Sequence, residues 1–426
     1  MKRALFFPNY FGGGFGHVGR CLALADELSS RGWKTGMLLN GSHAKAVKEA
    51  GLRIYKPWFP KIRDATATST VFYTYIVDGN IQIIRDGYVR PWRFWAAVGE
   101  ALCIVKKFRP TVLVGDFSLL TWVVGKQADL PVVQIAQSIS HPADPRIIWW
   151  EDVSPGMLSP RIEPVFNPVL EKWKMNPIHR VEELLQGDLF LIPSIPELEP
   201  LPQNVTNTHY IGALFLQKSE TPAMQGNKQT ETRKKVYVTI GGGAGTVGNL
   251  KYFEIINKGL GDGPWSAIVS TGRRFDPSKL PKAPSNIVYQ QWVNGPAVIK
   301  NSDVVVFHGG HGTMMETVHF GIPSVILPFH SEQEGNGRRL EACSASIVIS
   351  PSTMKESMRI VRNRWSYGEF AYLVQPVNTL TAEILREAVT RVLGDTRYKE
   401  NAMLLRAKSR GYGGAQKGAE IIINNA

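Results

Sequence analysis

The sequence predicts an α/β protein with two doubly wound halves, each a parallel sheet covered by helices. Two stretches open such a half, because in both an apolar run leads into a glycine-rich turn, at residues 4–16 and at residues 235–246. A length of 426 residues and a hydrophobic content of 43% suffice for two cores of ordinary size. We therefore expect two α/β domains joined by a linker.

The first half alternates short apolar strands with helical segments. A strand at 4–7, a glycine-rich turn ending in Gly16-His17, an amphipathic helix at 18–30 and a strand at 34–39 form a βαβ opening. The strand pattern then resumes at 111–115, 131–135 and 189–192. These elements place the first domain at residues 1–215.

The stretch 216–235 is polar, contains Pro and Gly and lacks apolar periodicity, so it is predicted to be the linker. A second series of strands begins at 235–240 and continues at 267–270, 287–289, 304–307 and 324–327. These strands place the second domain at 236–398. Residues 399–426, with a break at 411–414, form a separate C-terminal helical segment.

Composition narrows the class of protein. No run of 18 apolar residues occurs, which argues against a membrane-spanning helix. The basic start of the chain breaks into Pro, Asn and Gly too early for a signal peptide. Cys21, Cys103 and Cys343 are odd in number and far apart, so a disulfide framework is not expected. A cytoplasmic location follows as the prediction.

The formal net charge of +13 is uneven along the chain. Residues 1–216 hold 23 Lys and Arg against 19 Asp and Glu, and the remainder holds 26 against 17. The basic excess therefore lies mainly in the second half, which suits an anionic ligand there. Nucleic acid is not the expected partner, because no aromatic stacking motif or zinc spacing accompanies the charge.

The segment after the apolar strand 303–307 predicts a diphosphate site. A glycine-rich turn precedes a helix read from Thr313 onward, where free N–H groups and the helix dipole favour an anion. Gly310 and Gly312 let the backbone approach phosphate, while His308 is suited to donate to it and Thr313 to cap the helix or bind the anion. Glu316, read as N3 or N4 of the helix, either closes a capping box or accepts two ribose hydroxyls.

At this point the residues resemble the inverting nucleotide-sugar-dependent glycosyltransferases, the group related to UDP-glucosyl and UDP-glucuronosyl transferases and to macrolide and natural-product glycosyltransferases. Counted from His308, the matches to the family signature are Glu316, Gly321, Pro323, Pro328, Glu332, Gln333 and Asn336. The other interpretation is a Rossmann turn for a different phosphate ligand. The resemblance implies the GT-B architecture, two Rossmann-like domains facing across a cleft, with the C-terminal helix crossing back to the first domain.

The resemblance also implies roles for other donor-binding residues. Trp292, with Val293 beside it, matches the aromatic that lies against the nucleobase, and Glu332 with Gln333 matches the pair that reads sugar hydroxyls. Gly242 lies in the second glycine-rich turn, and Arg273 is a candidate phosphate clamp. No metal is expected, since no cluster has ligand spacing. No cofactor is expected either, the co-substrate being a UDP- or dTDP-sugar.

The catalytic candidates lie in the first half. His17 follows the first strand, at the sheet edge where doubly wound domains bind ligands, and His is a suitable base near neutral pH. Asp116 ends a neighbouring apolar run and is the candidate to orient that imidazole. A turn histidine and an N-cap aspartate are the structural alternatives. The resemblance covers Gly16-His17 and Asp116-Phe117, and implies that His17 is the general base.

Some positions depart from the family pattern. Arg20 stands where the family often has Pro, and Asn294-Gly295 replaces Pro-Gln after the nucleobase aromatic. Gly242 replaces a small hydroxyl residue, and Glu332 replaces the commoner Asp. His311 is expected to fill space within the turn.

The sequence is least informative about the acceptor. Aromatic residues gather at 55–60, 72–76, 86–108 and 147–150, as in a site for a hydrophobic acceptor or in an ordinary core. The basic, Trp-containing segment 85–109 is read as one helix that either rests on a membrane surface or is solvated.

The leading prediction is an inverting, metal-independent hexosyltransferase acting on a small hydrophobic, phenolic or natural-product hydroxyl. A membrane-surface glycosyltransferase with a lipid acceptor is the first alternative, and a non-catalytic nucleotide-sugar-binding subunit is the second. A sugar-nucleotide epimerase shares the fold, but its additional carboxylates are not found.

Overall fold

The computed structural model describes residues 1–9, 14–41, 43–57, 71–216, 232–241, 250–272, 275–350, 355–376 and 380–425. Most of the predicted linker lies outside these residues, so its limits stay a prediction. The last two linker residues do not belong to it, because Lys234 and Lys235 open the first strand of the second half.

The first half contains a parallel sheet of seven strands. In spatial order they are β3 (Arg53–Tyr55), β2 (Lys34–Leu38), β1 (Arg3–Pro8), β5 (Val112–Asp116), β6 (Val132–Ile135), β7 (Leu189–Ile192) and β8 (Thr208–Tyr210). The central strands β1, β5, β6 and β7 are buried along nearly their whole length, as expected for a parallel sheet covered on both faces.

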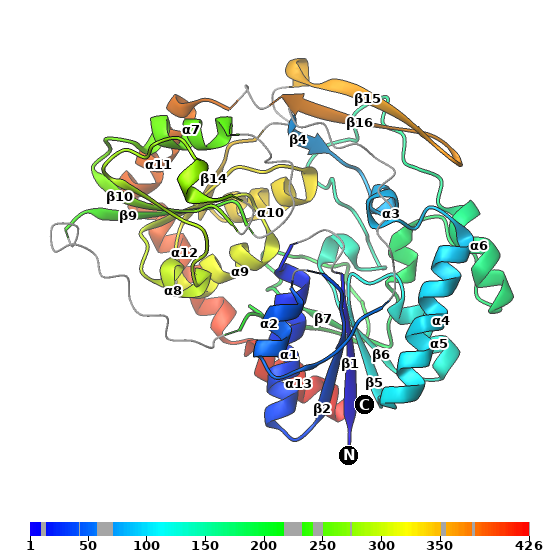
Figure 1. Cartoon of the computed structure of the whole chain (residues 1–426). Helices are drawn as coiled ribbons and strands as arrows, with labels where there is room; N and C mark the ends of the chain where they lie inside the picture. The colour runs from blue at the N-terminus through cyan, green and yellow to red at the C-terminus, as the bar shows by residue number, and fades with distance from the viewer. Residues whose placement is uncertain are drawn as a thin grey trace.

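The second half contains a parallel sheet of six strands. In spatial order they are β11 (Ile287–Gln290), β10 (Trp265–Ser270), β9 (Lys234–Thr239), β12 (Val304–Phe307), β13 (Ser324–Ile326) and β14 (Ser346–Val348). Figure 1 shows the two sheets in separate halves of the molecule.

The two sheets share one topology, and this determines where a ligand site is expected. In each sheet the first strand lies between a strand that follows it directly and one that returns from further along the chain. The order reverses between β1 and β5 in the first sheet, and between β9 and β12 in the second. Ligands of doubly wound sheets bind at this reversal, beyond the carboxyl ends of the strands.

Helices cover both faces of each sheet. The first half contains α1 (Gly16–Ser30), α2 (Ala44–Glu49), α3 (Asn80–Asp86), α4 (Pro91–Phe108), α5 (Thr121–Ala128) and α6 (Glu163–Lys172). The second half contains α7 (Lys251–Leu260), α8 (Gly295–Lys300), α9 (His311–Phe320), α10 (Ser331–Ala342), α11 (Ala382–Gly394) and α12 (Thr396–Arg410). The last helix of the chain is α13 (Gly414–Asn425).

Alternation along the strands produces two cores in each half. In β9, Val236 and Val238 join one core with α7 and α11, whereas Tyr237 between them joins the opposite core with α8, α9 and α12. In the first half, α4, α5 and α6 share a core on one face of the sheet, and α1 shares a core with α13 on the other.

A third, antiparallel sheet connects the two halves. β15 (Arg359–Trp365) and β16 (Gly368–Pro376) form a hairpin, and β4 (Val71–Tyr75) pairs with β16. Tyr73 and Tyr75 of β4 are fully buried in a core of the second half. Figure 1 shows the hairpin reaching over the first half, where Phe370 joins the core of α4 and α6.

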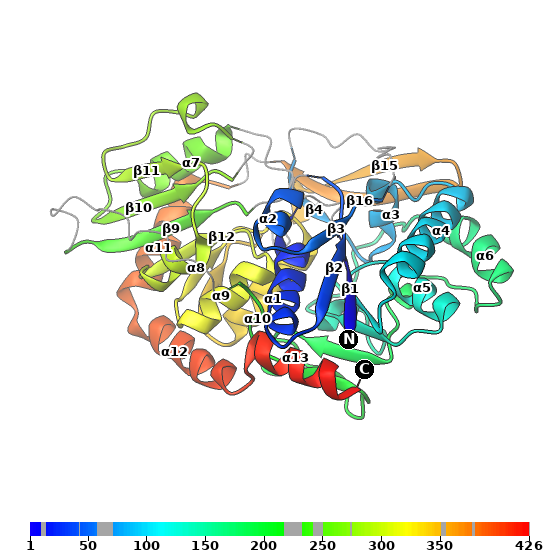
Figure 2. The same cartoon turned by 60° about the horizontal axis from the view of Figure 1, so that its bottom comes forward.

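The C-terminal helices return the chain to the first half. α12 lies against α9, and α13 lies against α1, as Figure 2 shows from below. Gly413 and Gly414, at the start of α13, both have positive φ, and Gly414 N–H donates to Ile211 O over 2.7 Å. Gly418 packs so closely on Leu24 that a Cβ there would lie 2.9 Å from it.

One predicted helix proved to be two. The segment 85–109 was read as continuous, but α3 ends at Asp86 and α4 starts at Pro91. Gly87 adopts φ +82 at the end of α3, and Pro91 supplies the first residue of α4, so a glycine and a proline divide the segment.

Candidate active site

The structure brings His17 and Asp116 together. His17 is the second residue of α1 and Asp116 is the last residue of β5, so both lie at the reversal point of the first sheet. His17 Nδ1 is 2.7 Å from Asp116 Oδ1, and the His17 side chain remains 31% exposed while Asp116 is buried. The second imidazole nitrogen is therefore the one available to a substrate.

The backbone around Asp116 is shaped for this contact. Phe117 adopts φ +51, a left-handed conformation that costs a non-glycine residue about 1–2 kcal/mol. Its ring stacks on the His17 imidazole with the ring centres 5.9 Å apart. Gly115 is required for packing, since a Cβ there would lie 2.2 Å from Gln134 Oε1. The strand end is thus held in a strained turn beside the histidine.

Arg20 completes the cluster and was noted in the sequence only as a departure from the family pattern. Its Nε donates to Asp116 Oδ2 and its Nη2 to Asp116 Oδ1, each over 2.7 Å. The same Nη2 lies 2.9 Å from His17 Nδ1. Burial alone would raise the pKa of Asp116, but Arg20 and His17 hold it below its usual value.

His308 directly follows β12, so it lies at the reversal point of the second sheet, as His17 and Asp116 do in the first. Its ring is pressed between two glycines, because a Cβ at Gly241 or at Gly310 would lie within 2.4 or 2.5 Å of it. Burial, with the nearby His330, lowers its pKa to about 4, although Glu332 acts in the opposite direction. His308 is therefore neutral at pH 7, with one N–H and one acceptor nitrogen on its ring, and it also hydrogen-bonds the Thr239 backbone.

The helix after this turn begins earlier than predicted. α9 starts at His311 with Gly310 as its N-cap, so Thr313 does not cap the helix and Glu316 is not at N3 or N4. Glu316 lies on the second turn, too far along for a capping box. Of the turn glycines, Gly309 adopts φ +84, and a Cβ at Gly312 would have no neighbour within 4 Å. Packing within the described residues does not require a glycine at position 312.

Among the described residues, no charge is recorded that offsets the desolvation of the Glu316 carboxylate. Burial raises its pKa to about 8, and no hydrogen bond to its side chain is recorded within the part of the chain that the structure describes. A Cβ on Gly295 would lie 3.4 Å from Glu316 Oε2, so the loop that carries Trp292 passes close to this carboxylate. Such a group gains free energy from a ligand that donates hydrogen bonds to it.

The start of α10 supports the turn from the other side. Gln333 Oε1 accepts from Phe329 N–H over 2.8 Å, and Asn336 Nδ2 donates to Gly309 O over 3.0 Å. The Glu332 side chain is 28% exposed, and its charge acts on Arg20 of the first half. Two of the predicted donor residues, Glu332 and Gln333, thus lie at the carboxyl end of the second sheet.

Trp292 is 50% exposed, so it does not belong to a core. Val293 beside it is partly buried against the core of α8 and α9. Gly242 and Arg273 lie outside the described residues, and their roles stay predictions.

The two halves meet through a buried polar contact that sequence reasoning missed. His311, expected to fill space, places Nε2 at 2.6 Å from Glu199 Oε1 and Nδ1 at 3.4 Å from Arg20 Nη1. Glu199 is fully buried and also accepts from Ser138 N–H. Burial would raise its pKa, but His311 and Arg339 hold it at about 2. The sequence held one signal for part of this cluster: Arg20 follows His17 by three residues, which puts both on one helix face.

Several aromatic residues considered for the acceptor belong to the contact between the halves. Trp149 and Trp150 lie against α10, where a Cβ on Gly335 would be 3.1 Å from each. The guanidinium of Arg338 lies over the Trp150 ring and that of Arg339 over the Trp149 ring, at 5.1 and 5.3 Å. These residues join the two halves by packing.

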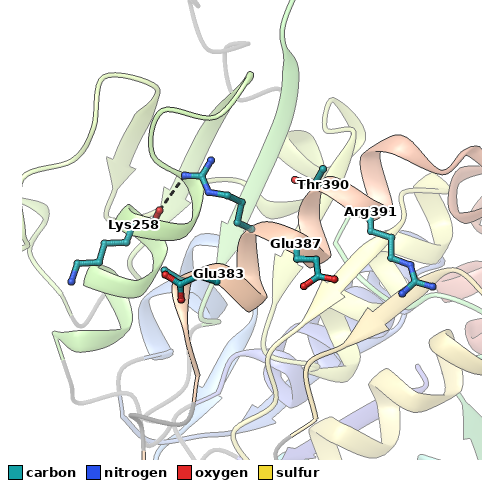
Figure 3. Close-up of a pocket in the computed structure, with 7 residues that line it drawn as sticks. Lys258, Glu383, Glu387, Thr390 and Arg391 are labelled. Carbon is teal, nitrogen blue, oxygen red and sulfur yellow. Dashed lines mark hydrogen bonds between the residues drawn. The ribbon is translucent and has the colours of Figure 1, made fainter.

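A groove of about 510 Å³ lies away from this site, between α7 and α11. Figure 3 shows its charged lining, which includes Lys258, Glu383, Glu387 and Arg391. None of the candidate site residues contributes to it. Among the described residues no group of His, Cys, Asp and Glu has the arrangement of a metal site, and no helix is long and apolar enough to cross a membrane.

Comparison with known proteins finds similar sequences and similar folds. Residues 267–364 match the family model "Erythromycin biosynthesis protein CIII-like, C-terminal domain", a range that contains Trp292, His308 and Glu316. The chain is 21% identical over 364 residues to the NDP-glycosyltransferase YjiC of Bacillus subtilis, which covers 82% of this chain and 86% of that protein.

Solved structures of similar fold cover nearly the whole chain. The calicheamicin glycosyltransferase CalG4 superimposes with a TM-score of 0.67 at 18% identity, over 99% of this chain and 98% of its own. The spinosyn rhamnosyltransferase SpnG complexed with thymidine diphosphate gives a TM-score of 0.67 at 17% identity, over 100% of both chains. The GT-B architecture predicted from the sequence is confirmed. The chain is thus similar in sequence and in fold to named glycosyltransferases.

Proposed function

We propose that the protein is an inverting, metal-independent hexosyltransferase that moves a sugar from a UDP- or dTDP-sugar to a hydroxyl of a small hydrophobic, phenolic or natural-product acceptor. The observation that carries the proposal is the contact of His17 Nδ1 with Asp116 at 2.7 Å, in the half opposite the His308 turn. Asp116 then fixes the imidazole so that the other nitrogen faces the acceptor.

The reaction is a single displacement. The imidazole nitrogen of His17 that does not face Asp116 takes the proton of the acceptor hydroxyl as its oxygen attacks the anomeric carbon. The bond from that carbon to the diphosphate oxygen breaks, so the nucleoside diphosphate leaves with the electron pair. One displacement inverts the anomeric configuration. A positioned base of this kind contributes roughly 10²- to 10⁴-fold to the rate.

The second half is suited to hold the donor. The N-terminus of α9 and the glycine-rich turn favour the diphosphate, and His308 carries an N–H at this turn. Glu316 offers a desolvated carboxylate to ribose hydroxyls, and Trp292 presents an exposed face for the base. SpnG was solved with thymidine diphosphate, which supports a dTDP-sugar as one of the two donor classes. No cofactor enters this reaction.

A lipid acceptor at a membrane surface is the second candidate, and α4 favours it. Trp92 and Trp95 are 59% and 54% exposed, and three residues of spacing put them on one helix face. Lys106 and Lys107 are exposed at the far end of the same helix. Exposed Trp with Lys on one helix suits an anionic interface. A cytoplasmic location stays a prediction in both cases.

Product analysis tests the proposal. The protein is incubated with a panel of UDP- and dTDP-sugars and a mixed aglycone library, with and without anionic vesicles, and products are identified by mass spectrometry. The anomeric configuration is then read by proton NMR. We expect transfer with inversion in the absence of vesicles.

Other outcomes overturn specific parts of the proposal. Retention of configuration would exclude the single displacement. Transfer only to lipid acceptors in vesicles would replace the proposal by the membrane candidate, and Trp92→Ala with Trp95→Ala should then lose vesicle binding. Binding of a nucleotide sugar with no transfer to any acceptor would favour the non-catalytic subunit, although such a protein has no need for the His17–Asp116 pair.

A further inference from the structure

Arg20 is buried at the contact between the halves, and each of its three nitrogens has a neighbour. Its Nε and Nη2 donate to the two oxygens of Asp116, and its Nη1 lies 3.4 Å from His311 Nδ1. The side chain is 5% exposed. A buried bidentate pair of guanidinium and carboxylate has a fixed relative orientation. The Arg20 side chain therefore does not turn toward solvent.

The protonation of His311 follows from its neighbours. Glu199 is ionised, with its pKa held at about 2 by His311 and Arg339 against the effect of burial, so His311 Nε2 must donate the hydrogen to it. Arg20 has only donors, so His311 Nδ1 must accept from Nη1. The second half therefore holds the guanidinium in place from the side opposite Asp116.

His17 Nδ1 therefore lies between two groups, one of which requires a hydrogen on this nitrogen and the other of which requires that it have none. Asp116 Oδ1, at 2.7 Å, requires a hydrogen on Nδ1 and leaves the other nitrogen, Nε2, free to act as a base. Arg20 Nη2, at 2.9 Å, donates to Nδ1 only if that nitrogen lacks its hydrogen, which puts the hydrogen on Nε2 instead. A neutral imidazole satisfies one of these groups at a time, and a protonated imidazole faces the cation.

We propose that Arg20 is a positioning residue that competes with His17 for Asp116 and thereby controls which nitrogen of His17 carries the hydrogen and how readily the imidazole takes up a second one. The inference rests on the proposed function in one respect, that His17 is the base. Arg20 places a positive charge 2.9 Å from His17 Nδ1, and this charge opposes the imidazolium form that the Asp116 carboxylate favours.

The charges around His17 determine the sign of this effect. Asp116 faces it from β5 and Arg20 from its own helix, while Glu332 of α10 and His311 of α9 reach Arg20 from the second half. Removing the positive charge of Arg20 leaves the Asp116 carboxylate to stabilise the imidazolium alone. An added or removed charge at this distance moves a titration by about one pH unit or more.

The first test compares Arg20→Gln with Arg20→Lys in pH profiles of kcat/KM between pH 5 and 9. Gln keeps a hydrogen-bond donor for Asp116 and removes the charge. Lys keeps the charge but cannot donate two parallel hydrogen bonds to the carboxylate. We expect the acid limb of Arg20→Gln to move upward by about one pH unit, and that of Arg20→Lys by less than half as much. If Arg20 has a purely structural role, kcat/KM should fall at every pH and the acid limb should stay at the wild-type pH.

The second test does not depend on activity. Histidine labelled with 15N reports the tautomer and the titration of His17 by NMR, with the signal assigned from His17→Asn. We expect Arg20→Gln to increase the fraction of His17 with the hydrogen on Nδ1 and to move its titration midpoint upward. A folded Arg20→Gln protein with the wild-type tautomer and midpoint overturns the inference. An NMR change with no change in the kinetic limb retains it and removes His17 from the role of base.

Discussion

Tyr73 and Glu334 lie 261 positions apart in the chain and share a buried hydrogen bond, in which Tyr73 Oη donates to Glu334 Oε2 over 2.5 Å. Tyr73 belongs to β4, in the first half of the sequence, and Glu334 belongs to α10, directly after Glu332 and Gln333. Arg338 Nε donates to the other carboxylate oxygen of Glu334 over 2.9 Å. The Tyr73–Glu334 hydrogen bond links β4, from the first half of the sequence, to α10, the helix that packs against the His308 turn.

Tyr73→Phe should lower the free energy of unfolding by about 1.5–3 kcal/mol, because it removes a buried hydrogen bond to a charged group. Urea unfolding followed by circular dichroism measures the change. Tyr252→Phe is the matched control, since the Tyr252 hydroxyl is buried in the same core with no hydrogen-bond partner among the described residues. Equal destabilisation by the two variants would contradict the prediction.

His17→Ala should reduce kcat by about 10²-fold or more, since the base that removes the acceptor proton is lost. Affinity for the nucleoside diphosphate should change little, because His17 lies in the opposite half from the donor turn. Steady-state kinetics and calorimetry with UDP and dTDP check the two quantities. Asp116→Asn should cause a smaller loss, since tautomer control is weakened but the imidazole stays. An unchanged kcat in His17→Ala removes it from the base role.

The affinity for a nucleoside diphosphate should increase as pH rises from 6 to 8. Burial raises the pKa of Glu316 to about 8, so its carboxyl is protonated at pH 6, whereas ribose hydroxyls require the ionised form as an acceptor. Each pH unit below 8 should therefore cost up to about tenfold in affinity through proton linkage. Calorimetry with UDP across this range measures it. Glu316→Gln should bind more weakly at pH 8 and lose this part of the pH dependence.

Trp292→Ala should weaken UDP binding by about 1–3 kcal/mol if the indole stacks on the base, by analogy with aromatic stacking in nucleic-acid sites. The melting temperature should stay near that of wild type, because the side chain is half exposed and contributes little to the core. Trp265→Ala provides the contrast, since Trp265 is buried in a core and its loss should lower the melting temperature. Unaltered UDP affinity in Trp292→Ala would exclude stacking.

The Glu199 contact should make the protein sensitive to acid. The folded-state pKa of Glu199 is held at about 2, below its ordinary value of 4.5, so its stabilising contribution is complete above pH 4.5 and is lost as the pH falls toward 2. Glu199→Gln should be less stable than wild type at pH 6, and the difference should shrink between pH 4.5 and 2. Thermal melts at several pH values test this, and a pH-independent difference would speak against it.

Short-range pattern was enough to identify most of the strands and the fold class. Apolar runs marked ten of the thirteen strands of the two parallel sheets, and the glycine-rich turns marked some of the βα connections. The three that were missed, β3, β8 and β14, are edge strands of three residues each. The sequence also placed His17, Asp116 and His308, because residues that follow parallel strands are carried to one sheet edge. It failed at a helix start, since α9 begins at His311, two residues before the start read at Thr313.

Only the tertiary structure decided which of these residues meet and what surrounds them. Three contacts join residues that lie 96 to 261 positions apart in the chain, and no local sequence pattern predicts such contacts. They are the two hydrogen bonds of Arg20 to Asp116, the His311–Glu199 contact and the packing of β4 on the second half. The desolvation of Glu316 likewise depends on the whole shell of atoms around it. The sequence by itself determined the elements and the chemical groups at the strand ends, because these follow from neighbouring residues. The pairing and burial of those groups follow from packing across the chain, and that packing sets their charge and their chemistry.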